Sequence, residues 1–163
     1  MIILALESSG ETGGAAIIKD GDIVSEVQVS GPRSHGSELM PAVDSALMNA
    51  EIARADIDLI AVNNGPGSYT GLRIGMSAAA AIGHALRIPV IGVNALDAMA
   101  LQLVLSDGFD VSIDAELWSV LDARRGEVMT AKYSWVDGEL RRESDSQLIE
   151  PAKLNETSGK GAL

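Results

Sequence analysis

Hydroxyl side chains beside glycines are the first candidates for chemistry in this chain, since a serine or threonine next to a base can act as a nucleophile. They are Ser8, Ser9, Ser68 and Thr70. An activated hydroxyl needs a general base within hydrogen-bond reach, most often a histidine. The sequence has two histidines, and neither stands at a recognisable spacing from these residues. We therefore expect the hydroxyls to form turns and helix caps.

The same two histidines, His35 and His84, are the only nitrogen ligands from which a metal site could start, and the chain has no cysteine. Zinc sites use three or four ligands, with histidines on a helix usually placed four residues apart. His35 precedes an expected helix, and His84 lies on the polar strip of another. The sequence therefore predicts no metal site.

A glycine-rich segment, residues 63–75, joins an expected strand to an expected helix. Glycines allow a sharp turn, Ser68 or Thr70 can cap the helix, and free amides at a helix N-terminus can bind an anion. The segment lacks the lysine of a phosphate-binding Walker loop and does not match G-x-G-x-x-G. A structural turn is therefore favoured over a phosphate cradle. The residues concerned are Gly65, Pro66, Gly67, Ser68, Tyr69, Thr70, Gly71 and Arg73.

The helix expected over residues 71–87 is apolar around most of its circumference. Residues with little or no side chain recur at every fourth position, which allows another element to approach closely. One interpretation is a core helix wedged between layers. The favoured one is that this helix and the preceding helix form an exposed apolar surface for a partner. The stripe of small residues consists of Gly71, Gly75, Ala79 and Gly83.

The preceding helix follows Gly31-Pro32, with Ser37 as a possible cap and Pro41 in or just beyond the first turn. Its apolar face runs from Leu39 to Ala50. Together the two helices provide the expected partner-binding residues: Met40, Val43, Leu47, Leu72, Gly75, Met76, Ala79, Ala80 and Gly83.

Hydrophobic patterning predicts an α/β chain of two parts. The first part reads βββαβαβα, with an Asp-Gly hairpin turn between its second and third strands. Its strands are expected at 2–7, 14–19, 23–29, 58–63 and 89–93, and its last helix at 96–105. The second part repeats the opening βββ, with strands at 117–122, 127–135 and near 140–148.

We expect the first lobe over residues 1–106 and the second over 107–163. Residues 150–163 are polar, and no further helix or strand is expected in them. Three strands without a covering helix would leave one sheet face open and an edge unpaired. The sequence therefore suggests either a fragment of a longer protein or a second lobe that is covered by something else.

Composition narrows the function classes. The chain has 163 residues, 47% of them hydrophobic, and a net charge of −11. A chain of this length and composition can bury a core. Its apolar runs are too short to span a membrane, and its N-terminus does not read as a signal peptide, which favours a cytoplasmic protein. Its acidity disfavours free-standing binding of DNA or RNA.

Five separated segments resemble one known family, the bacterial tRNA threonylcarbamoyladenosine biosynthesis proteins of the TsaB type. The most specific is Gly-Pro-Gly-Ser-Tyr-Thr-Gly-Leu-Arg-Ile-Gly, which looks like the signature of that family. The resemblance covers residues 1 to about 135. The segments are 3–9, 34–41, 65–75, 89–93 and 121–128.

The resemblance implies an actin-like ATPase (ribonuclease H-like) fold and a non-catalytic paralogue of the transferase TsaD. It implies a heterodimer with a TsaD-type subunit, a TsaE-type ATPase in the larger complex, and a homodimer when alone. In the family, pairing uses a helical bundle of the first lobe. The complex modifies adenosine 37 of tRNAs reading ANN codons, so this chain would meet tRNA only indirectly. ATP, magnesium and a metal ion are expected on the partner subunits. No cofactor is assigned to this chain.

In such a fold, carboxylates at the inner ends of strands would hold Mg²⁺ and orient water. Glu7 and Asp122 stand at the corresponding positions, so Glu7, Ser8, Ser9 and Asp122 are weak candidates for nucleotide binding. The family usually has aspartate where this chain has Glu7, and turn acids are the favoured interpretation. The alternative function is a stand-alone actin-fold nucleotide phosphotransferase or hydrolase. For the pair Arg124 and Arg125, a solvated hairpin turn is favoured over contact with an anion or RNA.

Overall fold

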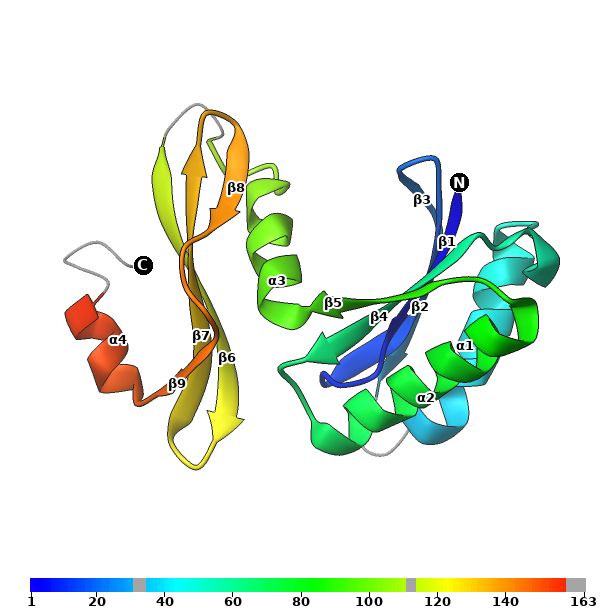
Figure 1. Ribbon diagram of the computed structural model, residues 1–163, viewed down its shortest axis with the longest axis horizontal. Helices are drawn as coiled ribbons and strands as arrows, with labels where there is room; N and C mark the ends of the chain where they lie inside the picture. Colours follow the sequence, from blue (N-terminus) through cyan, green and yellow to red (C-terminus); the bar gives the residue numbers. More distant parts are fainter. Residues whose placement is uncertain (31–34, 111–113, 158–163) are drawn as a thin grey trace. The chain divides into compact units, whose positions relative to one another are not determined.

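The computed structural model describes residues 1–30, 35–110 and 114–157, and the chain divides into two compact units, Met1–Asn94 and Ala95–Leu163 (Figure 1). The expected order of elements, βββαβαβα followed by further strands, is confirmed. The compact units meet between Asn94 and Ala95. This division does not test the expected lobe boundary between residues 106 and 107, which stays a prediction.

The first unit is a five-stranded mixed sheet with the strand order β3-β2-β1-β4-β5. The first three strands pair antiparallel, and β4 and β5 add in parallel to β1, as expected when a helix joins consecutive strands. The strands are β1 (Ile2–Glu7), β2 (Thr12–Lys19), β3 (Asp22–Ser30), β4 (Leu59–Gly65) and β5 (Val90–Asn94).

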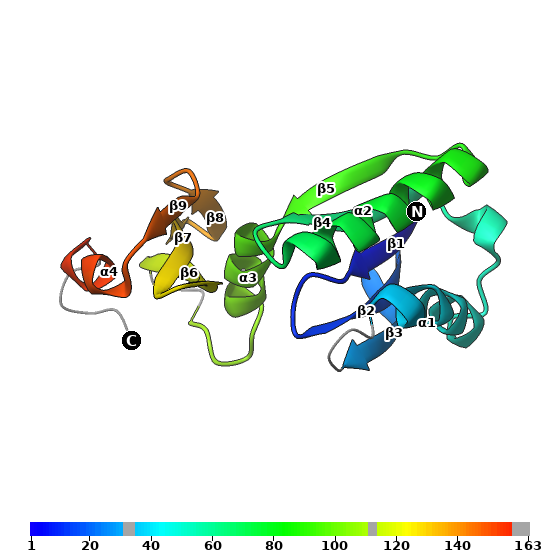
Figure 2. The ribbon, with the colours of Figure 1, turned by 90° about the horizontal axis from the view of Figure 1, so that it is seen from below.

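Two helices, α1 (His35–Asn49) and α2 (Tyr69–Leu86), pack on one face of this sheet and contact each other (Figures 1 and 2). A short 3₁₀ turn, Arg54–Asp56, precedes β4. Side chains at alternate strand positions meet the helices, as the two-residue period of a strand requires. The fully buried centre of this core includes Leu4, Ile17, Ala46, Ile60 and Ala79.

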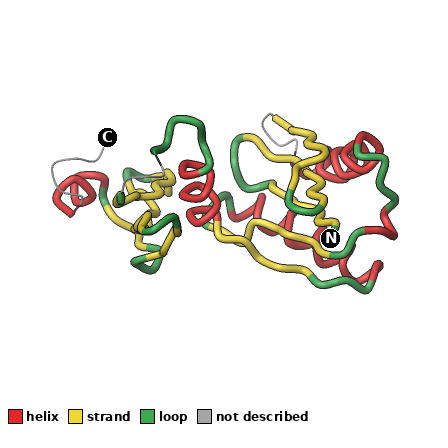
Figure 3. Tube along the Cα trace, turned by 90° about the horizontal axis from the view of Figure 1, so that it is seen from above, coloured by secondary structure: helices red, strands yellow, loops and turns green. Residues whose placement is uncertain are grey.

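The second unit begins with α3 (Ala95–Val104), which follows β5 without an intervening residue (Figure 3). Its sheet has β7 at the centre, paired with β6 on one side and with β8 and β9 at different points along the other. The elements are β6 (Ala115–Arg124), β7 (Glu127–Val136), β8 (Glu139–Arg142), β9 (Gln147–Ile149) and α4 (Pro151–Thr157).

The second sheet is covered by a helix that was expected in the first lobe, which agrees with the alternative that another element covers this sheet. The stripe Leu96, Ala100 and Val104 of α3 is buried against Leu117, Ala131 and Tyr133 of β6 and β7. Residues four apart share one face of a helix, so the stripe buries together once the helix meets a sheet. Periodicity predicted the helix but not the sheet against which it packs.

Three smaller expectations also need correction. The last expected strand, near 140–148, is interrupted and forms β8 and β9, and a short helix, α4, follows where none was expected. Helix α1 begins at His35 rather than at the expected cap Ser37, so Pro41 lies within the helix beyond its first turn.

Candidate functional site

The carboxylate of Glu7 lies at the end of β1 and is held by donors from its own turn and from the neighbouring strand. Oε1 accepts hydrogen bonds from the backbone N–H of Ser9 and of Gly10, the latter at 3.2 Å. Oε2 accepts from Asn63 Nδ2 at 2.6 Å. Oε1 therefore fixes the turn between β1 and β2, and Oε2 links the end of β1 to β4. This supports the interpretation of Glu7 as a turn acid rather than a magnesium ligand.

Asn63, on β4, joins the ends of two adjacent parallel strands. Its Nδ2 also donates to Ser9 Oγ at 2.9 Å, and its Oδ1 accepts from the backbone N–H of Gly65 at 2.7 Å. One amide thus serves the β1–β2 turn and the β4–α2 turn together. Sequence reasoning missed this residue, because Asn-Asn-Gly was read only as part of a turn.

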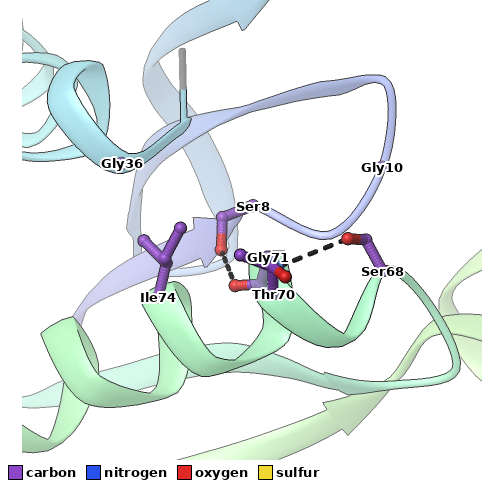
Figure 4. A pocket seen from close by; sticks show the side chains of 7 residues that line it. All are labelled: Ser8, Gly10, Gly36, Ser68, Thr70, Gly71 and Ile74. Atoms are coloured by element: carbon purple, nitrogen blue, oxygen red, sulfur yellow. Dashed lines mark hydrogen bonds between the residues drawn. The ribbon is translucent and has the colours of Figure 1, made fainter. Parts of the chain in front are cut away.

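The glycine-rich segment is also fastened to the β1–β2 turn through Ser8 and Ser9, and Figure 4 shows the hydrogen bonds that Ser8 and Ser68 make with Gly71. Ser8 Oγ donates to the carbonyl of Gly71 at 2.8 Å, and Ser68 Oγ accepts from the N–H of Gly71 at 3.4 Å. The Ser68 N–H donates to the carbonyl of Ser9 at 3.0 Å. Ser68 is thus the N-cap of α2, as expected, and Ser8 serves as a structural donor.

The glycines of this segment stand where a side chain would strike the β1–β2 turn. A Cβ at Gly67 would overlap Ser9 Oγ, and one at Gly71 would overlap the Ser8 carbonyl oxygen. A Cβ at Gly75 would lie 2.5 Å from Ser8 Oγ. These glycines are therefore a packing requirement. These close contacts favour the interpretation of residues 63–75 as a structural turn over the interpretation as a phosphate-binding loop.

A shallow pocket of about 370 Å³ opens beside this contact (Figure 4). Its polar lining consists of hydroxyls and backbone, and no charged side chain lines it among the described residues. The described lining therefore offers hydrogen bonds but no counter-charge for a phosphate. Its lining residues are Ser8, Gly10, Gly36, Ser68, Thr70, Gly71 and Ile74.

Within the described part of the first unit, no other candidate for nucleotide chemistry joins this cluster. Asp122 belongs to the second unit, where its Oδ1 accepts from the backbone N–H of Arg124 at 2.7 Å. His84 lies in the last turn of α2, at the opposite end from the pocket, and the side chain of His35 is outside the described residues. The remaining signature residues Tyr69 and Arg73 pair on the surface, with the guanidinium 5.6 Å from the ring centroid.

The expected partner-binding residues divide into two groups. Val43, Leu47, Gly75, Ala79 and Gly83 are buried within the first unit. The other group faces outward from the two-helix layer: Met40, Met76 and Ala80 are exposed and Leu72 is half-buried.

The small-residue stripe of α2 therefore meets this chain's own sheet and not a second chain. A Cβ at Gly83, for example, would overlap the Val90 side chain of β5. An α-helix can approach a strand this closely only where its side chains are small. The outward-facing residues are the part of the expected surface that a partner can reach.

Sequence reasoning also missed a cluster in the second unit. Tyr133 Oη donates to Asp97 Oδ1 at 2.7 Å, and Arg142 Nη1 pairs with the same oxygen at 2.8 Å. Burial, and then the hydrogen bond to Asp97, raise the pKa of Tyr133 far above its usual value. The cluster links α3 to β7 and β8, so it stabilises the packing of this helix on the second sheet.

Within the described parts of the chain, no three residues among His, Cys, Asp and Glu gather as they would around a metal ion. Over the same residues, no helix combines the length and the hydropathy needed to cross a membrane.

Comparison with known proteins points to one family. The family model for TsaD, tRNA N6-adenosine threonylcarbamoyltransferase, matches residues 23–163. The tRNA threonylcarbamoyladenosine biosynthesis protein TsaB of Bacillus subtilis is 34% identical over 142 residues, which are 87% of this chain and 59% of that protein. TsaB of Escherichia coli is 32% identical over 133 residues, covering 82% of this chain and 55% of the relative. The chain thus spans less than two thirds of the length of these relatives.

The fold comparison agrees. YeaZ from Pseudomonas aeruginosa superposes with a TM-score of 0.81 at 29% identity, over 92% of this chain and 68% of that one. The architecture of two β-rich units is the actin-like fold of this family.

Proposed function

The chain belongs to the TsaB/YeaZ family of TsaD-related proteins, and from this premise we propose that it is a non-catalytic subunit that pairs with a TsaD-type transferase. The process that it serves is threonylcarbamoyladenosine formation in tRNA, which the curated relatives name. In this proposal it activates the transferase, joins a TsaE-type ATPase in the larger complex, and pairs with itself when alone. The complex works in the cytoplasm on adenosine 37 of tRNAs reading ANN codons.

The observation that carries the pairing proposal is the outer surface of the α1–α2 layer. Met40 and Met76 are 38% and 39% exposed, whereas other residues of the same helices, such as Val43 and Ala79, are buried in the core. Methionine suits contact surfaces because its side chain is apolar and adaptable. Ala80 lies one helical turn after Met76 and is also exposed, which lets a partner helix approach α2 closely.

The occupied carboxylate of Glu7 supports the non-catalytic part of the proposal. Its oxygens accept from Ser9, Gly10 and Asn63, so most of its acceptor capacity is used within the fold. The contact of Gly71 with Ser8 argues likewise against the stand-alone phosphotransferase. Isothermal titration with Mg-ATP tests that alternative, and the proposal expects no binding heat from this chain alone.

Light scattering after gel filtration tests the pairing itself. The chain is run alone and then mixed with a TsaD-type partner. The proposal expects a homodimer alone and a heterodimer in the mixture. A folded chain that stays monomeric in both runs would contradict the proposal.

A further inference from the structure

The tip of the β6–β7 hairpin carries two adjacent arginines, Arg124 and Arg125, whose side chains are exposed. Neither guanidinium has an ion pair or hydrogen bond within the part of the chain that the structure describes. The nearby acid Asp122 does not neutralise them through a side-chain contact, because its Oδ1 accepts the backbone N–H of Arg124 at 2.7 Å. The tip therefore presents two cations on a hydrogen-bonded hairpin.

The backbone at the tip does not explain why arginine stands there. Arg124 pairs with Glu127, so Arg125 and Gly126 are the central residues of a two-residue turn, with φ of 57° and 80°. Positive φ at both central positions defines a type I′ turn, where asparagine or aspartate is preferred before glycine. Arg124 also has a positive φ, 67°. Arginine thus occupies a position at which local folding favours a different residue.

Three other cations of this unit differ from this pair. Lys132, Arg141 and Arg142 form ion pairs with Glu116, Glu139 and Asp97. The whole chain is strongly acidic, with a net charge of −11. The two adjacent arginines, which form no ion pair within the described residues, therefore make a small positively charged site on an acidic protein.

We propose that the hairpin tip formed by Arg124 and Arg125 binds backbone phosphates of the tRNA substrate when the chain is assembled with its transferase. This rests on the proposed function. A guanidinium presents donors in a planar fork that matches a phosphate group. Arginine also occurs at protein interfaces, but there it usually accompanies aromatic or large apolar side chains, and the neighbours Ala123 and Gly126 offer none. Because the chain as a whole repels RNA, the tip adds a contact to a complex that the partner holds together.

The test uses the assembled complex of the full chain with a TsaD-type partner. The dissociation constant for tRNA is measured over a range of salt concentrations, for the wild type and for the double variant Arg124→Gln/Arg125→Gln. We expect weaker binding, with the slope of log K against log salt reduced by about 1 for each arginine that contacts a phosphate. The control is Lys19→Gln/Arg87→Gln, which removes two exposed cations from the first unit and should leave the slope unchanged.

Light scattering on the same samples separates the outcomes. An intact complex with unchanged tRNA affinity and salt slope would overturn this inference and leave the proposed function standing. Loss of the complex in the double variant would show that the tip contacts protein, which also overturns the inference. Failure of the wild type to assemble would remove both proposals.

A second variant separates binding from folding. Arg125→Asn gives the type I′ turn its preferred residue, so the thermal unfolding midpoint should stay the same or rise. The tRNA affinity of the complex should nevertheless fall. A lower midpoint with unchanged tRNA affinity would assign Arg125 to the turn and contradict the inference.

Discussion

Asn63 Nδ2 donates a hydrogen bond to Glu7 Oε2 at 2.6 Å, which joins the ends of the parallel strands β1 and β4. In an α/β sheet, ligands bind at the carboxyl ends of the strands, in a crevice that loops leave open. Here the acid, the amide and the glycine-rich segment are hydrogen-bonded to one another at that edge, beside the shallow pocket. A structural fastening thus occupies part of the edge at which such folds bind ligands.

Substitution of Asn63 by alanine should destabilise the first unit. Glu7 Oε2 would lose its donor, and the N–H of Gly65 would lose its acceptor. Loss of partners for partly buried polar groups costs about 1–3 kcal/mol. Urea unfolding measures the change, with Asn64→Ala as the control, since Asn64 is the exposed neighbour. Equal stability of the two variants would show that the fastening is unimportant.

Substitution of Gly71 by alanine tests the packing explanation of the glycine-rich segment. The new Cβ would overlap the Ser8 carbonyl oxygen, so the helix or the turn must move. Overpacking of this kind costs about 1–3 kcal/mol, more than the gain from the higher helix propensity of alanine. Gly108→Ala is the control, because a Cβ there meets open space. A Gly71→Ala protein as stable as the wild type in urea would contradict the account.

Because the pKa of Tyr133 is raised in the folded state, we expect the second unit to lose stability at alkaline pH. Burial and Asp97 raise its pKa above the ordinary value of about 10. The folded state therefore keeps the phenol neutral while the unfolded state releases the proton. The stabilising contribution is complete below pH 10 and is lost as pH rises above it.

The measurement is the thermal unfolding midpoint between pH 8 and pH 11. We expect the midpoint to fall across this range and the fall to be smaller in Tyr133→Phe. Tyr69→Phe is the control, because Tyr69 is 74% exposed and should leave the pH dependence unchanged. The same alkaline fall in Tyr133→Phe would show that another group is responsible.

Much of the fold follows from periodicity. Apolar runs ending in Gly, Asp-Gly or Pro-bearing turns predict the strands, and apolar residues four apart predict the helices, so the order of elements is confirmed. Periodicity shows which face of an element is apolar but not what covers it. For this reason α3 was expected in the first lobe, although Leu96 and Ala100 pack on the second sheet.

The candidate site was predicted less completely. Ser68 as a cap and Glu7 as a turn acid follow from local rules on turns and caps. The stripe of Gly71, Gly75 and Gly83 was visible as a site of close approach, but the approaching element is distant in sequence. Asn63 was missed for the same reason, since its partner Glu7 lies 56 residues away.

The most direct test of the central claim is the affinity of the chain for a TsaD-type partner after a charge is placed on the outer face of α2. Met76→Glu is compared with the wild type and with Val24→Glu, which makes the same kind of change at an exposed apolar residue of β3. Burying an unpaired charge at an interface typically costs 2 kcal/mol or more, about a thirtyfold loss of affinity. The account predicts this loss for Met76→Glu alone, with all three proteins folded by circular dichroism. Equal affinity of the three proteins would contradict it.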